Sequence, residues 1–137
     1  MIILQLEFPG TTVPRKEFLK AIRKELIETL TMRAQILITL ITEISKNIYD
    51  HAEGYGTLEI KEIELGVFSF DIQDKGNEAH DLGYCRNHSR LAGNGTNFNA
   101  GIRIIQDIAE MPNFEHFKTD TTKGFHYSGL FRQNPLQ

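Results

Sequence analysis

The stretch at residues 36–52, ILITLITEISKNIYDHA, decides the fold of this chain. Its apolar residues recur at helical spacing, which predicts one amphipathic helix with a wide buried face. The residues that define this face are Ile36, Leu37, Leu40, Ile41, Ile44 and Ile48.

The same helix carries a polar stripe, which consists of Glu43, Asn47 and His51 at positions i, i+4 and i+8. The stripe follows the edge of the apolar face, whereas Thr42, Lys46 and Asp50 are expected to point toward water. A polar group that is buried without a hydrogen bond costs free energy. We therefore expect the stripe to be hydrogen-bonded or to face a ligand; the alternative is an ordinary solvated helix edge.

The composition is that of an ordinary globular protein, with 137 residues, of which 40% are hydrophobic and 24% charged, and we expect a single domain over 1–137. The net charge of −3 argues against a dedicated nucleic-acid-binding protein. We expect no signal peptide and no membrane span. The single cysteine, Cys85, excludes an intramolecular disulfide, so a cytoplasmic location is expected.

The segments around the stripe predict an α/β sandwich. Residues 2–8 alternate as a strand, and residues 14–30 form a first helix that ends in a break near Thr29–Met32. The stripe-bearing helix should end near Ala52, because Gly54 and Gly56 follow.

The second half predicts four strands, a loop and a helix. Thr57–Glu64 and Val67–Asp74 form a hairpin, residues 76–98 form a long loop, and Asn99 caps a helix that Pro112 stops. Phe114–Thr119 and Phe125–Phe131 form a second hairpin. The whole predicts a sheet that helices cover on one side.

Four motifs follow in one order. The pattern E-x-x-x-N-x-x-x-H-A at 43–52 resembles the N box of the GHKL, or histidine-kinase-like, ATPases. Asp74-Lys75-Gly76 resembles their G1 box, although Glu78 stands at its second glycine position, and GNGTNFNAGI at 93–102 resembles a degenerate G2 box. Thr122-Lys123-Gly124 is similar to the weak G3 region. The chain looks most like the anti-sigma-factor serine kinases, which implies a two-layer Bergerat-type fold with a mixed sheet and three helices on one face.

The resemblance also implies roles and cofactors, namely ATP and Mg²⁺. Asn47 would be the Mg²⁺ ligand, Glu43 the catalytic base and Asp74 the acceptor for the adenine amino group. His51 would border the nucleotide, or would merely pack at the helix end. Further ATP-binding positions are Gly76, Gly93, Gly95, Thr96, Gly101 and Ile102. Candidate partners for phosphate are Arg86, His88, Arg90 and Arg103, each of which could equally be a surface residue.

Three functions remain open. The first is a serine/threonine protein kinase that acts on a regulatory partner, either an anti-anti-sigma-like antagonist or a sigma factor. The second is a nucleotide-gated interaction module without phosphotransfer, which the degenerate G2 box and the lack of an arginine before it would favour. The third is a stand-alone catalytic domain of a histidine kinase. A homodimer that pairs through the first strand is a further expectation.

Overall fold

The computed structural model describes residues 1–51, 54–74, 95–120 and 125–135. The elements in chain order are β1 (Ile2–Pro9), α1 (Arg15–Leu30), a short 3-10 helix η1 (Thr31–Ala34), α2 (Gln35–His51), β2 (Tyr55–Glu64), β3 (Val67–Asp74), α4 (Gly95–Ala109), β4 (Phe114–Asp120) and β5 (His126–Arg132). The predicted order of helices and strands is confirmed. The expected break after the first helix is the 3-10 helix η1.

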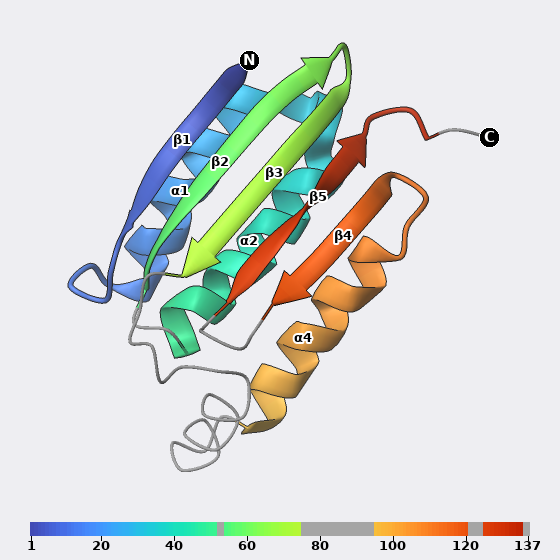
Figure 1. Cartoon of the computed structure of the whole chain (residues 1–137). Coiled ribbons are helices and arrows are strands. Elements are labelled where there is room, and N and C mark those ends of the chain that lie inside the picture. Colours follow the sequence, from blue (N-terminus) through green and yellow to red (C-terminus); the bar gives the residue numbers. More distant parts are fainter. Residues whose placement is uncertain (52–53, 75–94, 121–124, 136–137) are drawn as a thin grey trace.

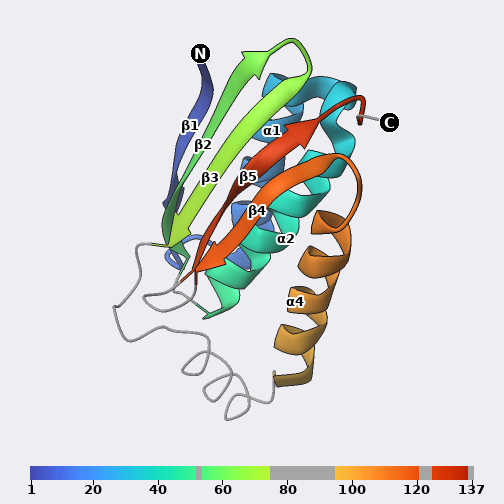
Figure 2. The ribbon, with the colours of Figure 1, turned by 45° about the vertical axis from the view of Figure 1, so that its right-hand side comes forward.

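The five strands form one sheet in the order β1-β2-β3-β5-β4, and α1, α2 and α4 cover one of its faces (Figures 1 and 2). The two-layer α/β architecture is therefore confirmed. The prediction of a mixed sheet is wrong, because all four neighbouring pairs of these strands are antiparallel. β5 lies between β3 and β4 in the sheet and is antiparallel to both. None of the described strand pairs is therefore parallel.

The core lies between the helical layer and the sheet. From α1, Phe18, Ile22, Leu26 and Leu30 point into it with at most 3% of their surface exposed. They recur every four residues, so they form one row along the helix. The predicted apolar face of α2 is also confirmed, since Leu37, Leu40, Ile41, Ile44 and Ile48 are fully buried. Complete burial of one such side chain contributes about 1.5–3 kcal/mol.

The end of α2 is fixed by glycine, as the sequence predicts. Gly54 has a φ of +72°, in the left-handed region, and its N–H donates to the carbonyl of Ile48 over 2.9 Å. The N–H of Gly10 donates in turn to the Gly54 carbonyl over 3.0 Å. The chain that leaves α2 is thereby tied to the loop that follows β1.

Two expectations about the helices are wrong. Thr42 is not turned toward water: it is 8% exposed, and its hydroxyl donates to the Ile38 carbonyl over 2.7 Å. α4, which packs against α2, widens the buried face of that helix beyond its apolar residues. In addition, α4 begins at Gly95 and not at Asn99.

Candidate functional site

The elements that carry the candidate residues meet at one end of the molecule. In Figures 1 and 2 the C-terminal ends of α2 and β3 and the N-terminal end of α4 lie at the same end of the molecule. Two polar side chains are buried there, Asn47 at 4% exposure and Asp74 at 7%. A buried amide and a buried carboxylate at the same end of a fold both need partners.

Asn47 lies in the last two turns of α2 and is the only buried side-chain amide nitrogen in the described residues without a hydrogen bond. Ser45 on the same helix shows the usual solution, because its buried hydroxyl donates to the Ile41 carbonyl over 2.7 Å. An amide donor left unpaired costs about 1–3 kcal/mol. A rotation of the carboxamide group by 180° exchanges its oxygen and its nitrogen. Either atom of Asn47 can therefore take the position that Nδ2 occupies.

Glu43 is held by Lys46, whose Nζ lies 2.9 Å from Glu43 Oε1. The side chain of Glu43 is 18% exposed and that of Lys46 36%. Lys46 keeps part of its side chain in water, and its flexible stem lies along the helix so that the ammonium group reaches the carboxylate. A lysine three residues after a glutamate on a helix is the sequence signal that indicates this pair.

His51 is the last residue of α2 and is half-buried. Burial lowers the pKa of the imidazole below its ordinary value of 6.5, and the negative charge of Asp50 opposes this shift only in part. The ring is therefore predominantly neutral near pH 7. A neutral imidazole can accept or donate one hydrogen bond but provides no fixed positive charge for a phosphate.

Asp74 ends β3 and faces the helical layer with Phe68, Phe70 and Ile72, as the two-residue period predicts. Its backbone N–H donates to the Phe125 carbonyl over 2.8 Å, and its Oδ2 accepts the Phe125 N–H over 3.4 Å. This second bond is at the long end of the hydrogen-bond range. The site of the carboxylate is set by the backbone that leads into β5.

Gly56 is a residue of this end of the sheet that the motifs did not indicate. It pairs with Asp74 in the ladder of β2 and β3. A Cβ at this position would lie 2.5 Å from the Gln73 carbonyl oxygen and 3.3 Å from Asp74 Cα. Any larger residue would therefore displace the strand that carries the carboxylate.

A clamp between α1 and α2 holds the stripe-bearing end of α2. Arg15 binds both oxygens of Asp50, with Nε to Oδ1 at 2.8 Å and Nη2 to Oδ2 at 3.0 Å. The hydroxyl of Tyr49 donates to the Val13 carbonyl over 2.7 Å. These bonds hold Tyr49 and Asp50, which lie between Asn47 and His51 in the last turn of α2.

The remaining candidates fall into two groups. Ile102 packs against the core, Gly95 and Thr96 lie in the first turn of α4, and Gly101 lies in its middle. Gly101 lies inside the helix, and the helix starts four residues before Asn99, its expected cap. Arg103 is exposed on α4. Gly76, Gly93, Arg86, His88, Arg90 and the turn at 122–124 lie outside the described residues.

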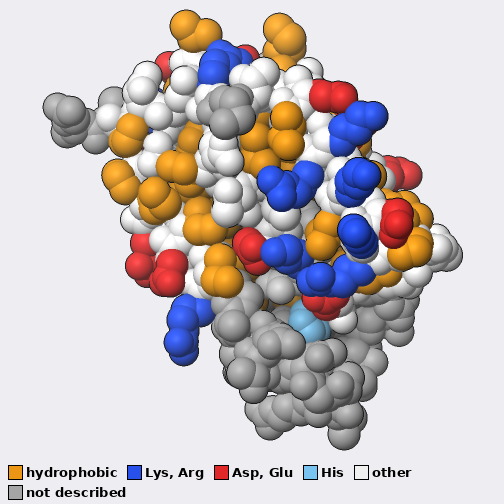
Figure 3. Space-filling view, turned by 180° about the vertical axis from the view of Figure 1, so that it is seen from behind, with side chains coloured by type: hydrophobic (Ala, Val, Ile, Leu, Met, Phe, Trp, Pro, Cys, Tyr) orange, Lys and Arg blue, Asp and Glu red, His pale blue; other side chains and the backbone are white. Residues whose placement is uncertain are grey.

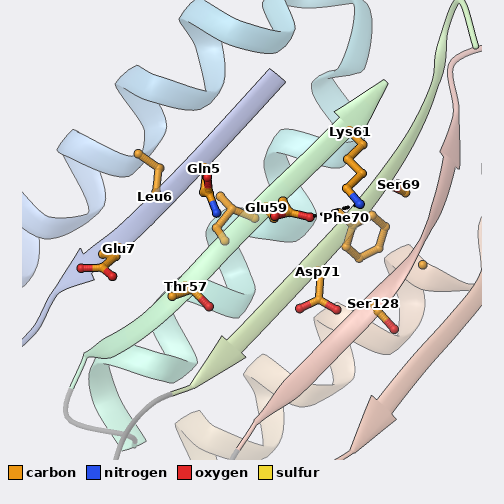
Figure 4. A pocket seen from close by; sticks show the side chains of 12 residues that line it. Gln5, Leu6, Glu7, Thr57, Glu59, Lys61, Ser69, Phe70, Asp71 and Ser128 are labelled. Atoms are coloured by element: carbon orange, nitrogen blue, oxygen red, sulfur yellow. Dashed lines mark ion pairs between the residues drawn. The ribbon is translucent and has the colours of Figure 1, made fainter. Parts of the chain in front are cut away.

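A large hollow lies elsewhere, on the sheet face that the helices leave open, with a volume of about 640 Å³. Figure 4 shows polar side chains of several strands along it, including Glu59, Lys61 and Asp71. Among its lining residues Lys61 pairs with Glu59 at 3.5 Å, and Asp71 Oδ2 lies 2.9 Å from His126 Nε2. The hollow is on the side of the sheet opposite to the stripe of α2, so it is not part of the predicted site.

Two searches of the described part of the chain give no positive result. No three His, Cys, Asp or Glu side chains come together there in a way that could hold a metal ion. No helix in this part is both long enough and apolar enough to span a bilayer.

Comparisons of the chain with protein-family models, with curated proteins and with solved structures gave no match.

Proposed function

We propose that this chain is an ATP- and Mg²⁺-binding domain of the GHKL type that phosphorylates a serine or threonine of a regulatory partner protein. The partner would be an anti-anti-sigma-like antagonist or a sigma factor, as the resemblance implies, and the location would be cytoplasmic. The single observation that supports the proposal most is the buried amide of Asn47, whose nitrogen has no hydrogen-bond partner among the residues that the structure describes. Its position on α2 matches the N-box asparagine.

The donor chemistry of Asn47 fits a magnesium ion. Mg²⁺ prefers hard oxygen ligands and retains several waters, so a single protein amide oxygen together with nucleotide phosphates is a sufficient set. When bound, the ion would neutralise phosphate charge during transfer. The clamp between Arg15 and Asp50 keeps the helix end that presents this amide in place.

Asp74 fits the nucleobase. A buried carboxylate, whose two oxygens together offer several lone pairs, can accept a hydrogen bond from the exocyclic amino group of adenine. Guanine presents a carbonyl oxygen at that position, and two acceptors repel each other. The buried setting strengthens this selection, because water cannot substitute for the missing donor.

The N-terminus of α4 fits the phosphates. The first-turn N–H groups of a helix have no acceptors within the helix, and the helix dipole favours an anion beside them. This end of α4 lies at the same end of the fold as the last turns of α2 (Figure 2). The adenine partner and the phosphate partner would therefore flank Asn47.

The ion pair of Glu43 with Lys46 favours a second candidate, a nucleotide-gated interaction module without phosphotransfer. A general base must reach the hydroxyl whose proton it takes, and this carboxylate is already engaged at 2.9 Å by an ammonium group. For the kinase to act, Lys46 must leave Glu43 when substrate binds. In the module, the pair would stay intact.

Calorimetric titration with ADP and Mg²⁺ tests both candidates at once. We expect saturable binding that disappears when Mg²⁺ is removed by a chelator and when Asn47 is replaced by leucine. Absence of binding to the parent protein would refute the kinase and the module together.

Incubation with γ-labelled ATP and candidate partner proteins then separates them. Label on serine or threonine supports the kinase, and binding without transfer supports the module. Label on histidine would instead support the histidine-kinase alternative.

A further inference from the structure

The outward face of α1 carries a hollow of about 570 Å³ that four cations surround. The cations are Lys16, Lys20, Arg23 and Lys24, and Leu19 and Ile27 supply its apolar lining. We call this surface the α1 basic groove. In Figure 3 it appears as a gathering of Lys and Arg side chains with apolar side chains between them.

The groove follows from the spacing of its residues. Lys16, Lys20 and Lys24 form one row at every fourth position, and Leu19, Arg23 and Ile27 form the adjacent row. Rows of this kind are the ridges between which a second helix packs. The opposite face of α1 is buried in the core, so the groove is the face of α1 that points away from the described core.

The charge of the groove opposes that of the whole molecule. Its four cations stand against one acid, Glu28, whereas the chain has a net charge of −3. Within the described residues none of these four cations forms an ion pair, in contrast to Arg15, which pairs with Asp50. Like charges on successive turns repel one another, so an anionic neighbour would stabilise them.

The groove also contains apolar surface that charge alone does not explain. Ile27 is 45% exposed, and Leu19 is partly buried against the core. A large apolar side chain among cations gains free energy when a partner covers it. A row of lysines beside a row that alternates Leu19, Arg23 and Ile27 is complementary to a helix that carries acidic residues next to an apolar row.

We propose that the α1 basic groove docks an amphipathic helical segment of an acidic partner protein. Its Glu or Asp side chains pair with Lys20, Arg23 and Lys24, and its apolar side chains cover Leu19 and Ile27. The inference does not depend on nucleotide binding, because it rests on the outer face of α1.

Two other classes of macromolecule fit less well. A membrane-surface helix inserts a broad apolar face, but that face of α1 is occupied by the core, and only Leu19 and Ile27 remain. A nucleic acid would use the cations but would leave these two apolar side chains without a role, and the net charge of −3 would repel it. An acidic helix uses both features.

The test uses a synthetic helical peptide that places Glu at every fourth position beside a row of Leu, with a peptide of the same composition in scrambled order as reference. Fluorescence anisotropy measures its binding to the full chain. We expect saturable binding of the helical peptide that weakens as salt is raised, and much weaker binding of the scrambled one. The double variant Lys20→Glu/Lys24→Glu should weaken binding at least about tenfold, and Ile27→Ser should weaken it several-fold.

The matched control is Arg33→Glu/Lys118→Glu, which makes the same change of net charge at exposed positions of η1 and β4. It should leave peptide binding nearly unchanged. Circular dichroism must show that all variants keep their helix content. The proposal is overturned by absence of saturable peptide binding or by equal loss in the control variant. It is also overturned if phosphatidylserine vesicles or duplex DNA bind the groove more tightly than the peptide does.

Discussion

Replacement of Asn47 by leucine should make the ligand-free protein more stable while it abolishes nucleotide binding. Leucine has the same branching as asparagine, and the site is 96% buried, since Asn47 is 4% exposed. The substitution removes an amide nitrogen that lacks a hydrogen bond, a feature that costs about 1–3 kcal/mol. It also adds apolar surface to the core.

The expected net effect is smaller than the sum of these gains. Leucine is larger than asparagine, and an overfilled core loses about 1–3 kcal/mol. We therefore expect an increase in the free energy of unfolding of about 1–2 kcal/mol, which raises Tm by about 3–6 °C for a chain of this length. Urea denaturation without nucleotide measures the first quantity, and calorimetry the second.

Ser45→Ala provides the control, because it changes a buried polar group on the same helix that is already hydrogen-bonded. This variant should gain no stability and should lose at most about 1 kcal/mol. A destabilisation of Asn47→Leu by more than about 1 kcal/mol would refute the reasoning, because it would mean that the amide has a partner in the ligand-free protein. Retention of Mg²⁺-dependent ADP binding by this variant would remove Asn47 from the proposed metal site.

Four further outcomes are expected. Glu43→Gln should leave ADP affinity within about twofold and abolish phosphotransfer to a partner; unchanged transfer would exclude this residue as the base. Asp74→Asn should weaken ATP binding by about tenfold or more and reduce discrimination against GTP, which competition titration measures. Burial lowers the pKa of His51 below 6.5 in the folded protein, so the unfolded chain is protonated at this residue first as the pH falls. The free energy of unfolding should therefore decrease below about pH 6.5. In His51→Gln the urea midpoint should fall less over that range, and an identical fall would contradict the assignment. A double-mutant cycle of Arg15→Met and Asp50→Asn should give a coupling of about 0.5–1 kcal/mol, since both side chains are partly exposed. Absence of coupling would show that the clamp does not hold α2.

Much of the fold could be predicted from short-range patterns. The bounds of α1, α2 and β3 follow from periodicity and from glycines, because the signals lie within the elements themselves. The direction of strand pairing could not be predicted in this way. It depends on β5 entering beside β3, a contact between segments far apart in the sequence.

For the candidate site, the positions of Asn47 and Asp74 could be predicted because helical and strand periods fix which face a residue takes. The burial of Thr42 could not, since it depends on the approach of α4, an element more than fifty residues away. The ion pair of Lys46 was also missed. A long flexible side chain can fold along its helix in either direction, and the helical wheel gives only the direction of its Cβ.

The place of β5 in the sheet has a consequence for how the chain acquires its shape. The Asp71–His126 contact joins residues 55 positions apart, and every hydrogen bond of the β3–β5 ladder spans a similar length of chain. β1, β2, β3 and the first two helices all lie within the first 74 residues, whereas among the described strands β4 pairs in the sheet only with β5. A chain cut before His126 would keep β1, β2, β3, α1 and α2 but would lack β5. In the folded part, β3 would then be an edge strand without its neighbour. Such a fragment should self-associate through that edge.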